Sequence, residues 1–223
     1  MDVDIAVFAR APVAGQAKTR LIPMLGAKGA AELQHALMRR SLTTALAANL
    51  GPVSLWCTPD CEHPAFVACS KQLCVPLFPQ HDADLGARMF HAFAQLCPQR
   101  PTLIIGTDCP ALTVDMLRAA ANVLLEGRDA VFVPAEDGGY VLIGLRHAVS
   151  SLFSGMPWGS ETVMADTRER LRRAGLRYRE LAPSWDLDRA EDFDRLRASG
   201  LMTQMGLDPS SVDASGIDSA CIP

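Results

Sequence analysis

The sequence predicts an α/β protein with a three-layer α/β/α architecture around a mixed, mostly parallel sheet. Short apolar runs of strand length alternate with stretches in which apolar residues recur every three or four positions. The runs 5–9 and 102–106 are almost uninterruptedly apolar, which is typical of strands buried on both faces. The runs 129–134 and 140–145 flank a Gly-Gly turn, so we expect them to form a hairpin that makes the sheet mixed.

The first half of the chain alternates predicted strands and helices. Strands are expected at 5–9, 53–57 and 73–78, and Pro76 argues against a central position for the third. A helix is expected over 28–48, where one stripe carries Leu33, Leu37, Leu42, Ala45 and Leu46. A second helical stripe comprises Leu85, Met89, Ala92, Phe93 and Leu96.

In the second half, strand 102–106 precedes a helix that Thr113 caps, and the hairpin follows. Ser160 is the expected cap of a helix over 161–174 that Gly175 ends. An edge strand at 177–182 and a helix at 190–198 complete the predicted domain, residues 1–198. The segment 199–223 is rich in Ser, Gly and Asp, and we expect a C-terminal tail there.

Composition narrows the class of protein. The 223 residues, 49% of them apolar, are enough for one domain with a full core. The net charge of −4 argues against nucleic-acid binding, which depends on basic surface. No uncharged apolar run is long enough for a membrane span, and the first residues lack the basic region of a signal peptide. Seven cysteines without a CxxC spacing predict reduced thiols and a cytoplasmic location.

Two loops that follow strands carry charges suited to phosphate and metal binding. The loop 9–21 contains Gly15 and the cations Arg10, Lys18 and Arg20, which suits phosphate oxygens, although it matches neither GxGxxG nor a Walker loop. Asp108 in GTDCP follows the strand at 102–106, where a carboxylate can hold Mg²⁺ or Mn²⁺. A solvated basic loop and a helix cap are the alternative interpretations.

Three further segments carry candidate residues. In AEDGGY, Glu136 and Asp137 are candidate acid–base groups and Gly138, Gly139 and Tyr140 candidate acceptor contacts, although the pattern also suits a plain turn. In PWGSET, Trp158 and Gly159 are candidate acceptor contacts or packing residues. In WDLD, Asp186 and Asp188 point to one side of an extended chain, so they complete a metal site with Asp108 or cap the next helix.

Together, FARAPVAGQAKTRL, GTDCPALT, AEDGGYVLIGL, PWGSETV and WDLDRAEDF resemble a bacterial family of GT-A-fold, glycosyltransferase-like proteins of the nucleotide-diphospho-sugar transferase superfamily. That family is similar to phospholactate guanylyltransferase and the molybdenum-cofactor nucleotidyltransferases. The resemblance spans about residues 4–198. It implies one GT-A domain that binds a nucleotide, with Asp108 at the metal-binding position. Only one acid of the usual DxD is present, so Asp186 or Asp188 has to supply the second ligand. Arg189 stands where the related DxDTxED ending has Thr.

Three functions follow from these observations. The first is glycosyl transfer from a nucleotide sugar to a small acceptor, assisted by Mg²⁺ or Mn²⁺. The second is nucleotidyl transfer from a nucleoside triphosphate with release of pyrophosphate, which the basic cluster at 18–20 favours because a triphosphate carries more charge. The third is a non-catalytic nucleotide-binding module, which the incomplete DxD suggests. The family label favours the first, and the sequence leaves the oligomeric state open.

Overall fold

A computed structural model describes residues 2–81 and 84–207. In this part of the chain seven strands form one sheet with the order β3-β2-β1-β4-β6-β5-β7. The strands are β1 (Asp4–Arg10), β2 (Val53–Thr58), β3 (Leu77–Pro79), β4 (Thr102–Ile105), β5 (Ala130–Pro134), β6 (Tyr140–Leu145) and β7 (Tyr178–Glu180). All neighbours are parallel except β6, which runs antiparallel to β4 and β5. The sheet is therefore mixed and mostly parallel, as predicted.

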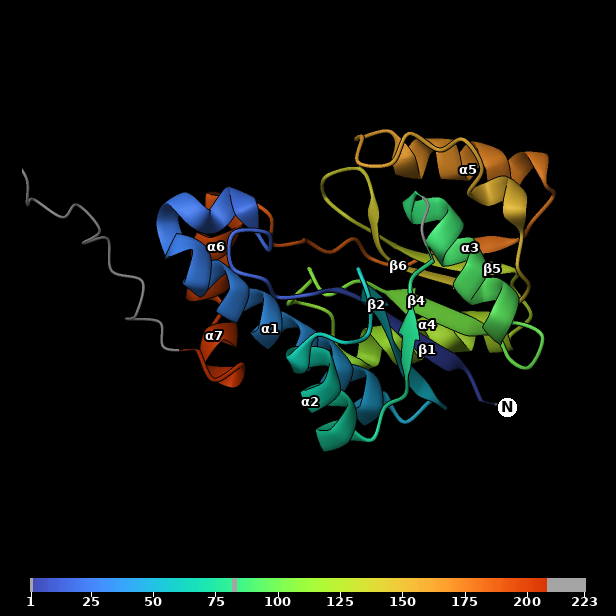
Figure 1. Ribbon diagram of the computed structural model, residues 1–223. Helices are drawn as coiled ribbons and strands as arrows, with labels where there is room; N and C mark the ends of the chain where they lie inside the picture. The colour runs from blue at the N-terminus through green and yellow to red at the C-terminus, as the bar shows by residue number, and fades with distance from the viewer. Residues whose placement is uncertain (1, 82–83, 208–223) are drawn as a thin grey trace, which may run out of the picture.

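Helices cover both faces of this sheet (Figure 1). One face packs against α1 (Ile22–Ala48), α2 (Pro64–Leu73) and α4 (Val114–Leu125). The opposite face packs against α3 (Leu85–Leu96) and α5 (Val163–Arg173). Strand β1 is buried along its length except at Arg10, because it lies in the middle of the sheet between the two layers. The predicted three-layer α/β/α architecture is confirmed.

A third apolar cluster lies to one side of the sheet. It joins the first part of α1 to α6 (Ala190–Ala198) and α7 (Leu201–Gln204) (Figure 1). Trp185 and Leu187 are buried in this cluster, whereas Asp186 and Asp188 alternate with them and are partly exposed. The alternation of the extended segment therefore anchors two side chains in the cluster and turns the two carboxylates away from it.

Several predicted elements are confirmed, among them the five strands at β1, β2, β4, β5 and β6 and the edge strand β7. The strand predicted at 73–78 is wrong in its first half, because α2 extends to Leu73 and β3 begins only at Leu77. Ser160 is not the cap of α5, since Thr162 occupies that position. Short 3₁₀ helices, Thr19–Leu21 and Ser150–Leu152, complete the described elements.

The predicted tail overlaps ordered structure at its start. Helix α7 lies inside 199–223, and its Met202 is 2% exposed in the third cluster. The domain boundary at residue 198 stays a prediction, and residues 208–223 lie outside the described part of the chain. Among the described residues, no helix combines the length and the hydropathy that crossing a bilayer requires.

Candidate active-site cleft

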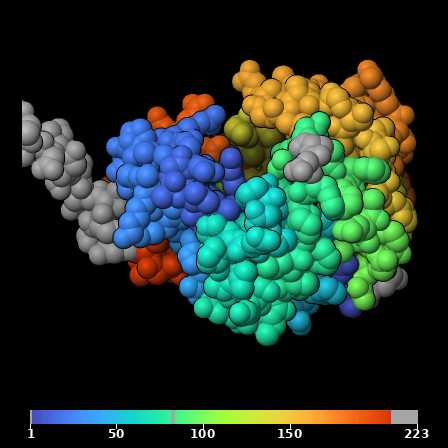
Figure 2. Space-filling view, viewed as in Figure 1, coloured from blue at the N-terminus to red at the C-terminus, as the bar shows by residue number. Residues whose placement is uncertain are grey.

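A cleft of about 580 Å³ opens beyond the carboxyl ends of the central strands. It is lined by residues that follow β1 and β4, by the β5–β6 turn, and by the segments 158–160 and 186–188. Figure 2 shows the hollow between the blue N-terminal segment and the green and orange surfaces of α3 and α5. Strands β2 and β3 lie on one side of β1, and the chain then crosses to β4 on the other side. Open α/β sheets bind ligands at such a switch point.

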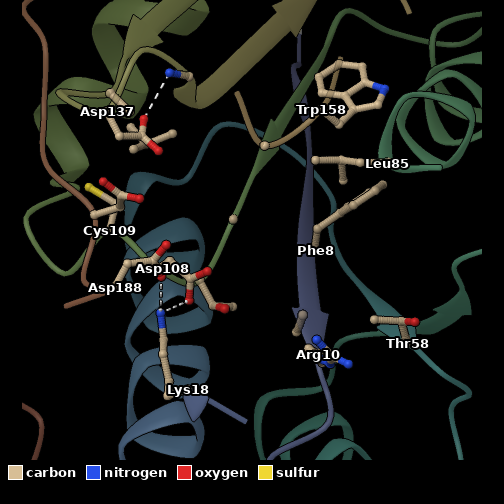
Figure 3. Close-up of a pocket in the computed structure, with 18 of the residues that line it drawn as sticks. Phe8, Arg10, Lys18, Thr58, Leu85, Asp108, Cys109, Asp137, Trp158 and Asp188 are labelled. Atoms are coloured by element: carbon tan, nitrogen blue, oxygen red, sulfur yellow. Dashed lines mark hydrogen bonds and ion pairs between the residues drawn. The ribbon is translucent and has the colours of Figure 1, made fainter. Parts of the chain in front are cut away.

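Lys18 lies at the centre of the polar end of the cleft (Figure 3). Its Nζ donates to Asp108 Oδ1 at 2.6 Å and to the carbonyl oxygen of Leu187 at 2.6 Å, and it lies 3.3 Å from Asp188 Oδ1. Three acceptors match the three N–H groups of an ammonium. The side chain is 5% exposed, so Lys18 holds the carboxylates together and has no N–H group to spare for a phosphate.

The backbone of Lys18 is in the left-handed region, with φ 46° and ψ 46°. For a residue other than glycine, this backbone conformation costs about 1–2 kcal/mol. The contacts of the buried ammonium with Asp108, Asp188 and the Leu187 carbonyl oxygen offset this strain. The side chain of Lys18 therefore points into the protein. The side chain of Arg20 is 68% exposed, and its Nη1 lies 3.6 Å from Asp188 Oδ2.

Asp108 is positioned by the loop that follows β4. Thr107 is buried and accepts a hydrogen bond from Gln34 Nε2 of α1 at 3.0 Å. The backbone oxygen of Asp108 accepts from Leu187 N at 2.7 Å. Cys109 Sγ lies 3.2 Å from Ser184 Oγ. These contacts join the loop after β4 to the segment 184–188, so two distant parts of the chain present carboxylates to one cleft.

Asp186 has the most perturbed carboxyl group of the cleft. Burial raises its pKa from 3.8 to about 6, and the nearby charges of Asp137, Asp188 and Asp108 act in the same direction. Carboxylates that lie close enough to raise one another's pKa also attract cations. The structure thus brings together the acids that the sequence placed in three separate loops.

The β5–β6 turn separates its two acids. Asp137 lines the cleft, and its Oδ1 accepts from Gly139 N at 2.9 Å. Glu136 does not line the cleft, because Arg195 of α6 binds it through two hydrogen bonds of 2.8 and 3.2 Å and lowers its pKa. Arg195 also stacks over Trp185, with 4.7 Å to the ring centroid. The structure therefore gives Glu136 an ion pair with Arg195 in place of the predicted acid–base position.

Two predicted glycines also lie outside the cleft lining. Gly15 is exposed in a turn with φ 83°, where a Cβ atom would meet no other described atom within 4 Å. At Gly138 a Cβ atom would lie 2.1 Å from the Glu161 carbonyl oxygen, so this glycine serves close packing of the turn against the segment before α5. The remaining predicted residues line the cleft, namely Arg10, Lys18, Arg20, Asp108, Asp137, Gly139, Tyr140, Trp158, Gly159, Asp186 and Asp188.

Several lining residues were not predicted. Gln34 carries its polar side chain on the apolar stripe of α1, which is a signal that the sequence contained. Gln80 follows β3 and is buried, and its Nε2 donates to the backbone oxygen of Trp56 at 2.8 Å. Phe8, Leu85 and Arg88 line the cleft as well. Nothing in the local sequence distinguishes these three from core or surface residues.

No metal site is shown for this protein. Within residues 2–81 and 84–207, no group of three or more His, Cys, Asp or Glu side chains is arranged to hold a metal ion. Lys18 takes the space between Asp108 and Asp188. The chemistry of the cleft nevertheless suits a hard cation, because the carboxylates of Asp108, Asp137 and Asp188 line it together with Asp186.

The family is shown by comparison with known proteins. Residues 41–160 match the model of the family DUF2064, whose description is "uncharacterized protein conserved in bacteria". The chain belongs to DUF2064. A crystal structure from Desulfovibrio desulfuricans G20, provisionally assigned as a nucleotide-diphospho-sugar transferase, has 30% sequence identity and a TM-score of 0.81, with 90% of this chain and 88% of that chain covered. No curated protein matches.

More distant solved structures share the fold of this DUF2064 member. CMP:2-keto-3-deoxy-manno-octonic acid synthetase complexed with CTP has 14% identity and a TM-score of 0.57, over 92% of this chain and 99% of that one. Glucosyl-3-phosphoglycerate synthase from Mycobacterium tuberculosis, in complex with Mn²⁺ and UDP, has 10% identity and a TM-score of 0.51, over 93% and 81%. The fold is that of the nucleotide-diphospho-sugar transferases, whose members include nucleotidyl and glycosyl transferases.

Proposed function

We propose that this DUF2064 protein is a divalent-cation-dependent glycosyltransferase that takes its donor from a nucleotide sugar. One observation carries the proposal: carboxylates from the loop after β4 and from segment 186–188 share one cleft with the cationic loop after β1. Such a cleft suits a pyrophosphate and a cation side by side. The likeness at 30% identity to a protein assigned to the nucleotide-diphospho-sugar transferases supports it.

Charge favours the glycosyl donor over a triphosphate. Among the described residues that line the cleft, four are cationic (Arg10, Lys18, Arg20 and Arg88) and four are acidic (Asp108, Asp137, Asp186 and Asp188). Lys18 is already neutralised by the acids. A nucleotide sugar with a divalent cation is close to neutral and matches this balance, whereas a triphosphate complex keeps a net negative charge.

In the proposed reaction an acceptor hydroxyl oxygen forms a bond to the anomeric carbon of the donor sugar. The bond from that carbon to the pyrophosphate oxygen breaks, and the nucleoside diphosphate leaves with the electron pair. Asp137, at the exposed β5–β6 turn, takes the hydroxyl proton and later releases it to water. The exposed guanidinium of Arg20 binds the leaving diphosphate.

Asp108 and Asp186, with Asp188, are the residues that would hold Mg²⁺ or Mn²⁺. When bound, such a cation supplies charge stabilisation for the departing phosphate. Lys18 holds Asp108 and Asp188 in place without a ligand, so its ammonium fixes the spacing of the two carboxylates. A structure solved with Mn²⁺ and UDP among the fold neighbours is in line with this arrangement.

Nucleotidyl transfer is the second candidate, because the 68% exposed Arg20 offers a cation for a third phosphate. Product analysis separates the candidates. We would incubate the protein with Mn²⁺, pooled nucleotide sugars, nucleoside triphosphates and hydroxyl acceptors, and identify the released phosphate compound by chromatography. We expect a nucleoside diphosphate that disappears with Asp108→Asn and persists with the surface variant Lys28→Met. Pyrophosphate would establish the second candidate, and no product at all would leave a nucleotide-binding module.

A further inference from the structure

The end of the cleft away from the carboxylates has an apolar wall made by Phe8, Leu85 and Trp158. These residues come from β1, from the first position of α3 and from the segment before α5. Figure 3 shows them together at one end of the cleft, opposite Lys18, Asp108 and Asp188. Leu85 is 45% exposed. A large apolar side chain that is exposed inside a concave site is typical of a surface that a ligand covers.

Trp158 is held in a fixed position by a glycine. A Cβ atom at Gly86 would lie 2.6 Å from Cζ2 and 2.7 Å from Nε1 of the indole, so the ring rests directly on the backbone of α3. Glycine inside a helix costs about 1 kcal/mol relative to alanine, and here it permits that contact. Tyr140 meets the indole edge to face, with centroids 6.4 Å apart.

The indole presents carbon surface to the cleft. Trp158 lines the cleft, but its Nε1 is buried and has no hydrogen-bond partner among the described residues. Its close neighbour is Gly86 of α3. An aromatic ring that is fixed at its edge and carries no available donor favours stacking with the flat face of another ring over hydrogen bonding.

A cation stands next to this wall. Arg10 follows Phe8 by two residues on β1, so both side chains lie on the same face of the sheet. Arg10 is exposed, and its side chain makes no hydrogen bond or ion pair with any residue in the described ranges. Its partner in the strand register is Thr58 of β2, which lies beside it in Figure 3. Among the described residues, Arg10 pairs with no carboxylate, whereas Lys18 and Arg20 both pair with Asp188.

We propose that this end of the cleft is the acceptor subsite and that it takes a ring compound bearing an anionic group. The ring stacks on Trp158 and contacts Phe8 and Leu85, and the anion binds the guanidinium of Arg10, with Thr58 as a hydroxyl partner. A sugar phosphate, a sugar carboxylate and an aryl phosphate share this chemistry. The proposal rests on the proposed function, since it assigns the acceptor of that reaction, and it moves Arg10 from donor binding to acceptor binding.

Binding of small probes tests the subsite without knowledge of the donor. Glucose 6-phosphate, glucuronate and phenyl phosphate are ring anions, glucose is a ring without the anion, and glycerol 3-phosphate is an anion without the ring. Each is titrated into the full chain and followed by ligand-observed NMR. We expect at least one ring anion to bind at least tenfold more tightly than both glucose and glycerol 3-phosphate. The preferred probe identifies which of the three sources fits.

Variants assign the binding to the two parts of the subsite. Arg10→Gln should weaken the preferred ring anion at least tenfold and leave glucose unchanged. Gly86→Ala, which pushes the indole off α3, should weaken it by a similar factor. Gly29→Ala is the matched control, because a Cβ atom there meets only Leu25 Cβ at 3.3 Å in helix α1. Leu85→Gln, at an exposed position, is the second test of the wall should Gly86→Ala fold poorly.

The proposal is overturned if no ring anion binds, if glycerol 3-phosphate binds as tightly as the ring anions, or if Arg10→Gln and the wall variants leave the dissociation constant unchanged. A titration with UDP, GDP, CDP and ADP in the presence of Mn²⁺ accompanies the probes. Nucleotide binding without ring-anion binding refutes the subsite and leaves the proposed function in place. Ring-anion binding without nucleotide binding refutes the proposed function instead.

Discussion

Replacement of Asp186 by asparagine should stabilise the fold, although Asp186 belongs to the proposed site. The side chain is partly buried among Asp137, Asp188 and Asp108, and its pKa is about 6 instead of 3.8. Because each pH unit corresponds to about 1.4 kcal/mol, the ionised carboxylate destabilises the folded chain by about 3 kcal/mol. Asparagine keeps the shape and the acceptor oxygen but removes the charge.

The sign of the pH dependence follows from the raised pKa. Below about pH 3 the carboxyl group is protonated in the folded and in the unfolded chain, so wild type and Asp186→Asn should be equally stable. As the pH rises from about 4 to 6, only the unfolded chain ionises readily, and the wild type loses stability relative to the variant. Above about pH 6 the full difference is present.

Calorimetric or urea unfolding at about pH 3 and at about pH 7.5, with EDTA present, measures the difference. At pH 7.5 we expect the variant to melt about 6–12 °C higher, since 1 kcal/mol corresponds to about 2–4 °C for a chain of this length. Asp188→Asn should stabilise less than Asp186→Asn, because the loss of its pairs with Lys18 and Arg20, about 0.5–1 kcal/mol, opposes the relief of Asp186. An Asp186→Asn variant that is no more stable than wild type at pH 7.5 would refute the raised pKa of Asp186, which burial and the neighbouring carboxylates cause.

Three further substitutions test individual contacts of the cleft. Lys18→Met removes three interactions of a 5% exposed ammonium and should lower the unfolding free energy by about 2 kcal/mol, a value discounted because both acids are half exposed. The control Lys28→Met, at a 90% exposed side chain, should change the unfolding free energy little. Equal effects of the two substitutions would contradict the role assigned to Lys18. Gln34→Leu leaves buried Thr107 without its donor and should destabilise by about 1–3 kcal/mol and slow turnover by shifting Asp108, measured by unfolding and product formation. Glu136→Gln breaks an exposed pair with Arg195 and should leave turnover within about twofold of wild type; a large loss would return Glu136 to the chemistry.

Local patterns predict the strands and most helices because periodicity and burial coincide in this chain. Residues 5–9 are apolar throughout and 102–106 are apolar after Thr102, and both runs become buried central strands. Helix α2 escapes prediction because it buries only Phe66 and Cys69, which is too weak a stripe to distinguish from a loop. The apolar residues of 73–78 therefore predict a strand that is longer than the three residues of β3.

The site was predictable as a set of loops but not as a set of contacts. The rule that ligands bind beyond the carboxyl ends of strands placed Asp108 and Asp186 at one rim, and the structure brings them into one cleft. Two of the three partners of Lys18, Leu187 and Asp188, lie 169 and 170 residues away in sequence, so no local pattern reveals that its ammonium is occupied. Likewise, the ion pair that holds Glu136 outside the cleft is made with Arg195, which lies 59 residues further along the sequence.

The central claim is that the acids near residues 108 and 186 and the cationic loop after β1 form one nucleotide site. Isothermal titration of UDP, GDP, CDP and ADP into wild type and Asp108→Asn, each with and without Mn²⁺, tests it most directly. We expect at least one nucleoside diphosphate to bind wild type in a Mn²⁺-dependent manner and to lose at least tenfold in affinity with Asp108→Asn. Absence of nucleotide binding to wild type, or equal binding to the variant, would contradict the claim.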